Sequence, residues 1–197
     1  MLKKIVIIGP ECTGKTTLCE QLAQHYNASW CPEYAREYLL NHGKKYDFDD
    51  LLTIAKGQIK LEEESIQSAI GNDLLLRSDS KNHSDHFPLF IDTDMYVMKV
   101  WSEFVFGKCH PYILYQLTER KYDLYLLCDI DLPWVEDELR EYPDLKTREK
   151  LYHIYKKLME NQTTPWLEIK GNSDERLQKA IRAIDDLLFE PVIAGKK

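Results

Sequence analysis

The chain has 197 residues and carries 33 acidic against 26 basic side chains, which gives a formal net charge of −7 at pH 7. This length predicts a single domain over residues 1–197 and is too short for two catalytic domains, and the acidic balance argues against a broad nucleic-acid-binding surface. No apolar run reaches the ~20 residues that span a bilayer, so we expect a cytoplasmic protein that binds neither nucleic acid nor membranes, while its oligomeric state is not indicated.

The first predicted elements are a strand and a helix joined by a glycine-bounded loop. Residues 3–9 form an apolar, β-branched run that predicts a strand buried on both faces. Leu18, Leu22 and Tyr26 then recur at four-residue spacing, which predicts a helix over residues 14–26 with one apolar stripe.

Strands and helices are predicted to alternate along the rest of the chain. In order, they are a short strand over residues 28–32, a short helix over 33–41, a long helix over 49–70, a polar surface loop over 77–87, a strand over 88–92, a helical region over 96–119 that breaks near Gly107 and Pro111, a strand over 121–129, a helix over 147–162, a strand over 166–169 and a helix over 173–189. We expect Asp47 or Asp49 to cap the long helix, Gly71-Asn72 to end it, and Ser173 to cap the last helix. This alternation indicates an α/β fold of three layers, α/β/α, with a five-stranded parallel sheet.

Residues 9–16, GPECTGKT, match the pattern GxxxxGK[ST] in full and lie between the predicted strand and helix that this pattern requires. Backbone N–H groups of such a loop and the positive end of the helix dipole form a cradle for phosphate. We expect Lys15 to reach the β- and γ-phosphates of ATP and the Thr16 hydroxyl to hold Mg²⁺. The residues predicted to bind the nucleotide here are Gly9, Glu11, Cys12, Thr13, Gly14, Lys15, Thr16 and Thr17.

Asp92 ends the strand predicted over residues 88–92, and the carboxyl ends of parallel strands face the ligand crevice. It is therefore the expected Walker-B carboxylate, a ligand of Mg²⁺ and part of the catalytic set. The competing interpretation is a simple cap for the following helix. Position 93 is threonine rather than the glutamate that polarises water in motor ATPases, which favours transfer to an organic hydroxyl over hydrolysis.

A cluster of charged and aromatic side chains follows the second predicted strand. Glu33 is the candidate acceptor of a proton from the substrate hydroxyl, with Asp92 or Asp94 as the rival. Arg36 would pair with substrate or phosphate, and Tyr34 would stack on a ring. The alternative is an ion-paired helix surface without a catalytic role.

Residues 134–149 form a proline-interrupted, charged stretch where a small kinase would carry a lid. We expect Arg140 to have a catalytic role and Arg148 to bind the nucleotide. Both would close over the γ-phosphate, stabilise the charge of the transition state and exclude water. Solvated surface arginines are the alternative. Tyr96, Trp101 and Phe104 are candidates for the wall of an acceptor pocket, although aromatic residues at helical spacing are more often part of the core.

The segments GPECTGKTTL, CPEYAREYL, FIDTDMYV and WVEDELR occur in this order, and through them the chain resembles the nicotinamide riboside (ribosylnicotinamide) kinase domain of NadR-type proteins. The resemblance runs from Lys4 to the final helix. It implies a P-loop fold of the nucleoside-kinase kind and the reaction of ATP with nicotinamide riboside to give nicotinamide mononucleotide and ADP. The residues to which it assigns roles are Gly14, Lys15 and Thr16 for ATP and magnesium, Glu33, Tyr34 and Arg36 for the nucleoside, and Asp92 and Asp94 for magnesium or ribose.

A second function remains open, in which the chain is a nucleotide-dependent switch that hydrolyses ATP slowly and passes a loop movement to a partner. The chain lacks an NKxD-like motif for reading guanine, which argues against a GTPase. Turnover of ATP with and without the riboside separates the two functions.

Overall fold

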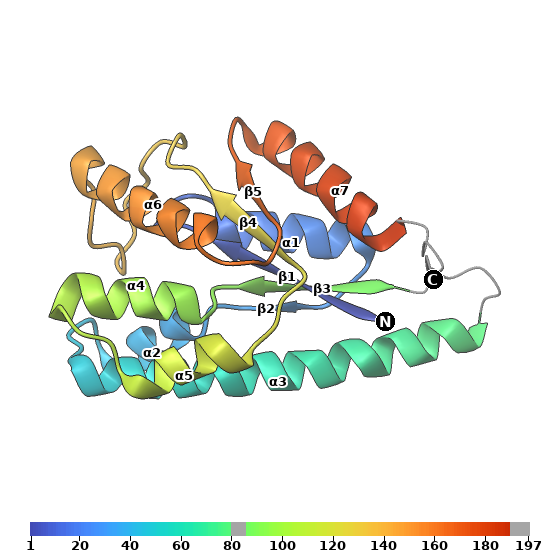
Figure 1. The fold of residues 1–197 in the computed structure, drawn as a ribbon, viewed down its shortest axis with the longest axis horizontal. Coiled ribbons are helices and arrows are strands. Elements are labelled where there is room, and N and C mark those ends of the chain that lie inside the picture. The colour runs from blue at the N-terminus through green and yellow to red at the C-terminus, as the bar shows by residue number, and fades with distance from the viewer. Residues whose placement is uncertain (80–85, 190–197) are drawn as a thin grey trace.

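The computed structural model describes residues 1–79 and 86–189, with side chains described throughout except at 76–79. Five parallel strands form one sheet in the order β2-β3-β1-β4-β5 (Figure 1). The strands are β1 (Leu2–Ile8), β2 (Trp30–Cys31), β3 (Phe87–Asp92), β4 (Leu124–Cys128) and β5 (Trp166–Ile169). The helices are α1 (Lys15–Tyr26), α2 (Tyr34–His42), α3 (Phe48–Asp79), α4 (Met95–Phe106), α5 (Pro111–Glu119), α6 (Leu145–Glu160) and α7 (Ser173–Phe189).

The central strand β1 shows why helices cover both faces of the sheet. Successive side chains of a strand point to opposite faces. Ile5 and Ile7 pack with α1 and α7 in one buried cluster, whereas Val6 and Ile8 pack with α3, α4 and α6 in another. The predicted three-layer α/β/α fold with a five-stranded parallel sheet is confirmed.

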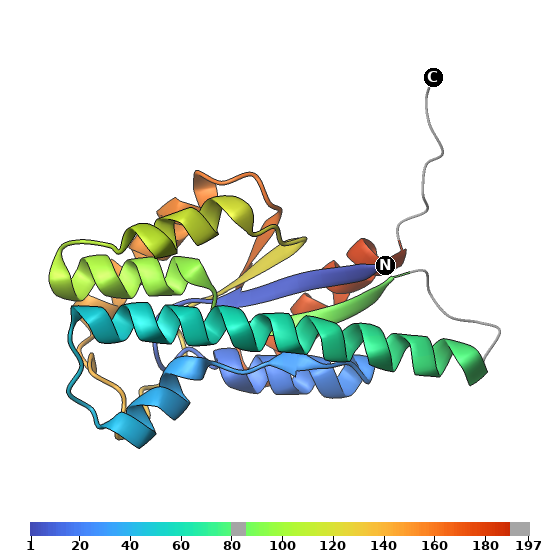
Figure 2. The same cartoon turned by 90° about the horizontal axis from the view of Figure 1, so that it is seen from below.

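A third buried cluster lies beyond the sheet, where α2, α3, α4 and α5 pack together. Figure 1 shows α3 along the bottom of the molecule, and Figure 2, seen from below, shows it in front, running along most of the molecule's length. Within the described residues, none of the helices combines the length and apolar composition that a membrane span requires.

The predicted end of the long helix is wrong. The helix α3 continues through Gly71-Asn72 to Asp79, because a single glycine costs a helix only ~1 kcal/mol and a Cβ at Gly71 would meet nothing within 4 Å. The predicted loop over 77–87 therefore begins inside α3, while residues 80–85 lie outside the described residues.

The caps of α3 and α7 show how local hydrogen bonds set a helix start. Asp47, one of the two predicted caps, accepts the N–H groups of Asp49 and Asp50 at 2.8 and 3.0 Å. Asn172, not Ser173, caps α7, because its Oδ1 accepts the Glu175 N–H at 3.0 Å while the Glu175 carboxylate accepts the Asn172 N–H at 2.9 Å. This reciprocal pair is a capping box.

Candidate active site

A cavity of about 470 Å³ opens at the carboxyl ends of the strands. Parallel strands bring the loop after β1, the end of β3 and the segment after β4 to the same edge of the sheet. The cavity is lined by the β1–α1 loop and the start of α1, by α2 and the loop between α2 and α3, by α4 and α6, and by the segment between β4 and α6. The lining residues are Gly9 to Thr17, Glu33, Ala35, Arg36, Leu39, Lys44, Tyr46, Val97, Val100, Trp101, Phe104, Glu138 to Tyr142, Leu151 and Tyr155.

The β1–α1 loop, residues 9–14, has the backbone of a phosphate-binding cradle. Its φ angles are positive at Gly9 (142°), Cys12 (56°) and Gly14 (77°), which turns successive N–H groups into one concavity. Gly9 admits no side chain, since a Cβ there would lie 2.7 Å from the carbonyl oxygen of Cys128. The Lys15 ammonium donates to the Pro10 carbonyl at 3.0 Å and so lies along the mouth of this loop.

Thr16 lines the cavity, and Asp92, which is fully buried and does not line it, lies directly behind Thr16. The Thr16 hydroxyl donates to Asp92 Oδ2 at 2.5 Å, while the buried Oδ1 has no hydrogen-bond partner among the described residues. Burial, and secondarily the nearby Glu33 carboxylate, raise the pKa of Asp92 to about 6. A hydroxyl and a carboxylate oxygen are ligands that Mg²⁺ prefers, so this donor set fits the cation. Within residues 1–79 and 86–189 no cluster of three His, Cys, Asp or Glu side chains could hold a metal, so phosphate and water would complete the coordination.

Asp94 lies behind the cavity and does not line it. Its side chain caps α4 by accepting the Tyr96 N–H at 2.9 Å, and it accepts the Tyr125 hydroxyl at 2.7 Å. Burial raises its pKa to about 7. Asp94, rather than Asp92, is thus the helix cap, and its carboxylate is engaged away from the acceptor side.

The cluster predicted for the acceptor is divided by the fold. Glu33 and Arg36 line the cavity, and Glu33 also accepts the Thr93 hydroxyl at 3.4 Å. Tyr34 turns away, and its ring packs so closely on α3 that a Cβ at Gly57 would lie 2.0 Å from it. The sequence pattern does not reveal this, because Gly57 is distant along the chain.

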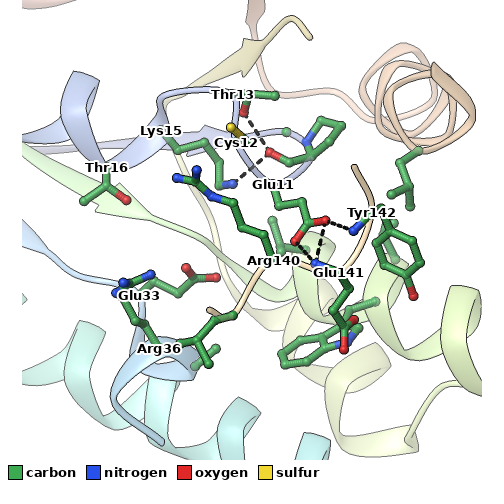
Figure 3. A pocket seen from close by; sticks show the side chains of 18 of the residues that line it. Glu11, Cys12, Thr13, Lys15, Thr16, Glu33, Arg36, Arg140, Glu141 and Tyr142 are labelled. Atoms are coloured by element: carbon green, nitrogen blue, oxygen red, sulfur yellow. Dashed lines mark hydrogen bonds between the residues drawn. The ribbon is translucent and has the colours of Figure 1, made fainter. Parts of the chain in front are cut away.

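Residues 129–144 join β4 to α6 and contact both sides of the cavity; the lid predicted over 134–149 lies partly in this segment and partly in the start of α6. Arg36 donates to both carboxylate oxygens of Asp137 at 2.9 and 3.2 Å, which lowers the pKa of Asp137 to about 2. On the other side, Glu11 accepts the backbone N–H groups of Glu141, at 3.0 Å, and Tyr142 (Figure 3). The segment is therefore fixed to α2 and to the phosphate loop at once.

The two arginines of this region occupy different places. Arg140 lines the cavity, where Figure 3 shows it around the same space as Lys15, Glu33 and Arg36. Arg148 is 4% exposed and lies under the phosphate loop, with Nη2 3.4 Å from the Cys12 carbonyl oxygen and its guanidinium over the Trp134 ring. It does not line the cavity.

The far wall of the cavity contains a hydrogen-bonded row that the sequence did not reveal. Trp101 Nε1 donates to the Tyr46 hydroxyl at 2.8 Å, and that hydroxyl donates to Glu141 Oε2 at 2.9 Å. Trp101 was a candidate for this wall, whereas Tyr46 and Glu141 were not. No local signal marks them, since the three residues come from three separate parts of the chain.

Most of the chain matches a known protein family. The family model AAA_28, described as an AAA domain, matches residues 4–176. The chain belongs to this AAA domain family. The AAA domain is 23% identical over 194 residues to the trifunctional NAD biosynthesis/regulator protein NadR of Escherichia coli strain K12, which covers 96% of this chain but 43% of NadR. The chain thus spans less than half the length of this relative.

Solved structures share the fold of this AAA domain. NadR in complex with NAD and AMP-PNP superimposes with a TM-score of 0.70 at 21% identity, covering 94% of this chain and 49% of that one. NadR in complex with NR gives 0.66 at 20% identity, with 94% and 51% covered. Thymidylate kinase from Ehrlichia chaffeensis gives 0.57 at 15% identity, with 93% and 98% covered.

Proposed function

We propose that this AAA domain is an ATP- and magnesium-dependent kinase that phosphorylates a hydroxyl of a nucleoside-like molecule, with nicotinamide riboside as the acceptor. The observation that supports it best is that, in one cavity, the phosphate loop and Thr16, with Asp92 behind it, face Glu33, Arg36 and an aromatic wall. A NadR structure contains NR, another contains AMP-PNP, and a thymidylate kinase has the same fold, which agrees with this proposal.

The part of the cavity that binds the nucleotide would act by positioning the phosphates and by supplying positive charge. Backbone N–H groups of residues 9–14 would bind the phosphates, and Lys15 would lie against the β- and γ-phosphates. Thr16 and Asp92 would hold magnesium, which supplies positive charge to the phosphates when bound. Arg140 would add charge on the side of the γ-phosphate, where negative charge is spread in the transition state.

The part of the cavity that binds the acceptor would position the substrate hydroxyl as the nucleophile. The hydroxyl oxygen attacks the γ-phosphorus while the bond from that phosphorus to the bridging oxygen breaks, which yields a phosphate monoester and ADP. The hydroxyl proton passes to the Glu33 carboxylate. Glu33 suits this role because it lines the cavity, whereas Asp92 would hold the cation and Asp94 caps a helix outside the cavity.

The segment over 134–149 would be the lid. Its contacts with Glu11 and Arg36 hold it beside the cavity, and closing over both substrates would keep water from the γ-phosphate. In this arrangement Arg148 would act from below the phosphate loop rather than from the lid surface.

The decisive experiment incubates the protein with ATP, magnesium and nicotinamide riboside and follows the products by ³¹P NMR and mass spectrometry. We expect one new phosphate monoester on the riboside for each ADP formed. Release of inorganic phosphate at the same rate with and without the riboside would contradict the kinase and favour the nucleotide-dependent switch.

A further inference from the structure

The side chain of Arg176, on α7, is buried against the outside of the phosphate loop. It is 4% exposed, and its Nη1 donates to the Thr13 carbonyl oxygen at 2.8 Å. Its Nη2 donates to the Asp129 carbonyl at 3.0 Å, and its Nε to the Gly171 carbonyl at 2.8 Å. An ion pair with Asp131 completes its contacts. One guanidinium therefore joins the phosphate loop to the ends of β4 and β5.

The Thr13 carbonyl is the contact that matters for phosphate binding. The carbonyl of Thr13 and the N–H of Gly14 belong to one planar peptide unit, and the described residues contain no cis peptide bond. In a trans unit these two groups point in opposite directions. By holding the carbonyl on the α7 side, Arg176 turns the Gly14 N–H toward the side where Gly14 lines the cavity.

This loop needs such a contact because its backbone is strained. Cys12 has a φ of 56°, a left-handed conformation that costs a non-glycine residue roughly 1–2 kcal/mol. Strain of this kind persists only where the surroundings fix it. Arg148 contacts the neighbouring Cys12 carbonyl in the same manner at a longer 3.4 Å, so two arginines hold two successive peptide units from behind.

We propose that Arg176 is a positioning residue for nucleotide binding, which acts by fixing the orientation of the Thr13–Gly14 peptide unit in the phosphate loop. Nothing in this role depends on the identity of the acceptor; it rests only on the binding of a nucleoside triphosphate by the loop. Arginine is required because its planar fork reaches three carbonyl groups at once, whereas the ammonium of lysine presents one compact charge.

The test measures the dissociation constant of AMP-PNP with magnesium by calorimetry for the wild type, Arg176→Met and Arg176→Lys. Arg182→Met, an exposed arginine on the same helix, is the matched control. We expect binding about tenfold weaker for both Arg176 variants, which corresponds to about 1.4 kcal/mol, and a control within about twofold of the wild type.

A purely structural role gives a different result. Loss of stability alone lowers the fraction of active protein, but it leaves the dissociation constant of the folded molecules and the KM for the riboside unchanged. Circular dichroism shows which variants are folded. If Arg176→Met does not fold, the affinity of Arg176→Lys for AMP-PNP decides between the two roles, because lysine keeps the buried charge and most of the volume. A folded Arg176 variant that binds AMP-PNP as tightly as the wild type would overturn the proposal. A wild type that binds AMP-PNP but phosphorylates no riboside would refute the proposed acceptor and leave this inference standing.

Discussion

The Thr16 hydroxyl lies 2.5 Å from Asp92 Oδ2, so the first turn of α1 and the last residue of β3 meet at one point. The two residues are 76 positions apart, and only the parallel pairing of β1 with β3 brings them together. The other carboxylate oxygen of Asp92 is buried and has no partner among the described side chains. This pair defines where the cation and the phosphate tail would sit.

Asp92→Asn is the sharpest test of that arrangement. Asparagine keeps the shape and can still accept from Thr16, but it removes the negative charge. We expect kcat to fall about 100-fold or more, as for loss of other transition-state electrostatics, with a clear rise in the magnesium concentration needed for half-maximal activity. Titration of activity with magnesium measures both. An unchanged magnesium dependence would place the cation elsewhere.

The pKa values of the two buried aspartates predict how stability depends on pH. Burial raises the pKa of Asp92 to about 6 and that of Asp94 to about 7. The folded chain therefore binds these protons more tightly than the unfolded chain, and the resulting stabilisation is fully present below about pH 4 and is lost as the pH rises through about 6 to 7.

We expect Tm, measured with EDTA present, to fall across this pH range. Asp94→Asn should flatten the slope, because asparagine caps a helix as well as aspartate does but does not titrate. A slope equal to that of the wild type would show that Asp94 is ionised throughout the range.

Lys15→Ala should abolish ATP turnover. The ammonium lies at the mouth of the phosphate loop, 3.0 Å from the Pro10 carbonyl, and alanine removes the only side-chain cation of residues 9–17. Because the side chain is not part of the buried core, circular dichroism should show an intact fold. Coupled detection of ADP measures the loss, and normal turnover would refute the assignment of this loop.

Glu33→Gln should lower kcat by roughly two orders of magnitude, as for loss of a general base, and should change the affinity for AMP-PNP little. The reason is its place on the acceptor side of the cavity, close enough to Asp92 to raise the pKa of that residue. Steady-state kinetics and calorimetry together separate the two effects. An unchanged kcat would contradict Glu33 as the proton acceptor and leave its rivals, Asp92 and Asp94.

Tyr46→Phe should raise the KM for the riboside about fivefold and leave the KM for ATP unchanged. The substitution removes the hydroxyl that joins Trp101 to Glu141, and one hydrogen bond of this kind contributes ~1 kcal/mol. Tyr115→Phe, on an exposed part of α5, serves as the control. Equal effects on both KM values would show that the wall serves the whole site rather than the acceptor.

Sequence reasoning succeeded where the determinants are local. The phosphate loop follows from eight consecutive residues, and Asp92 follows from its place at the end of an apolar run. It failed where tertiary contacts decide: α3 passes through Gly71 without a stop, and Tyr34 turns onto Gly57 instead of into the cavity. The same limit hid the wall formed by Tyr46 and Glu141, which are 95 positions apart in the chain and meet only in the folded structure.

The hydrogen bonds of Glu11 make the nucleotide and acceptor sites interdependent. Glu11 belongs to the phosphate loop, yet its carboxylate binds the backbone of Glu141, whose own side chain belongs to the opposite wall. In the proposed kinase, an adjustment of the loop on receiving a triphosphate would pass through this contact to the acceptor wall. A bound acceptor would then change the affinity for the triphosphate by the same factor, so we expect the two ligands to bind with cooperativity.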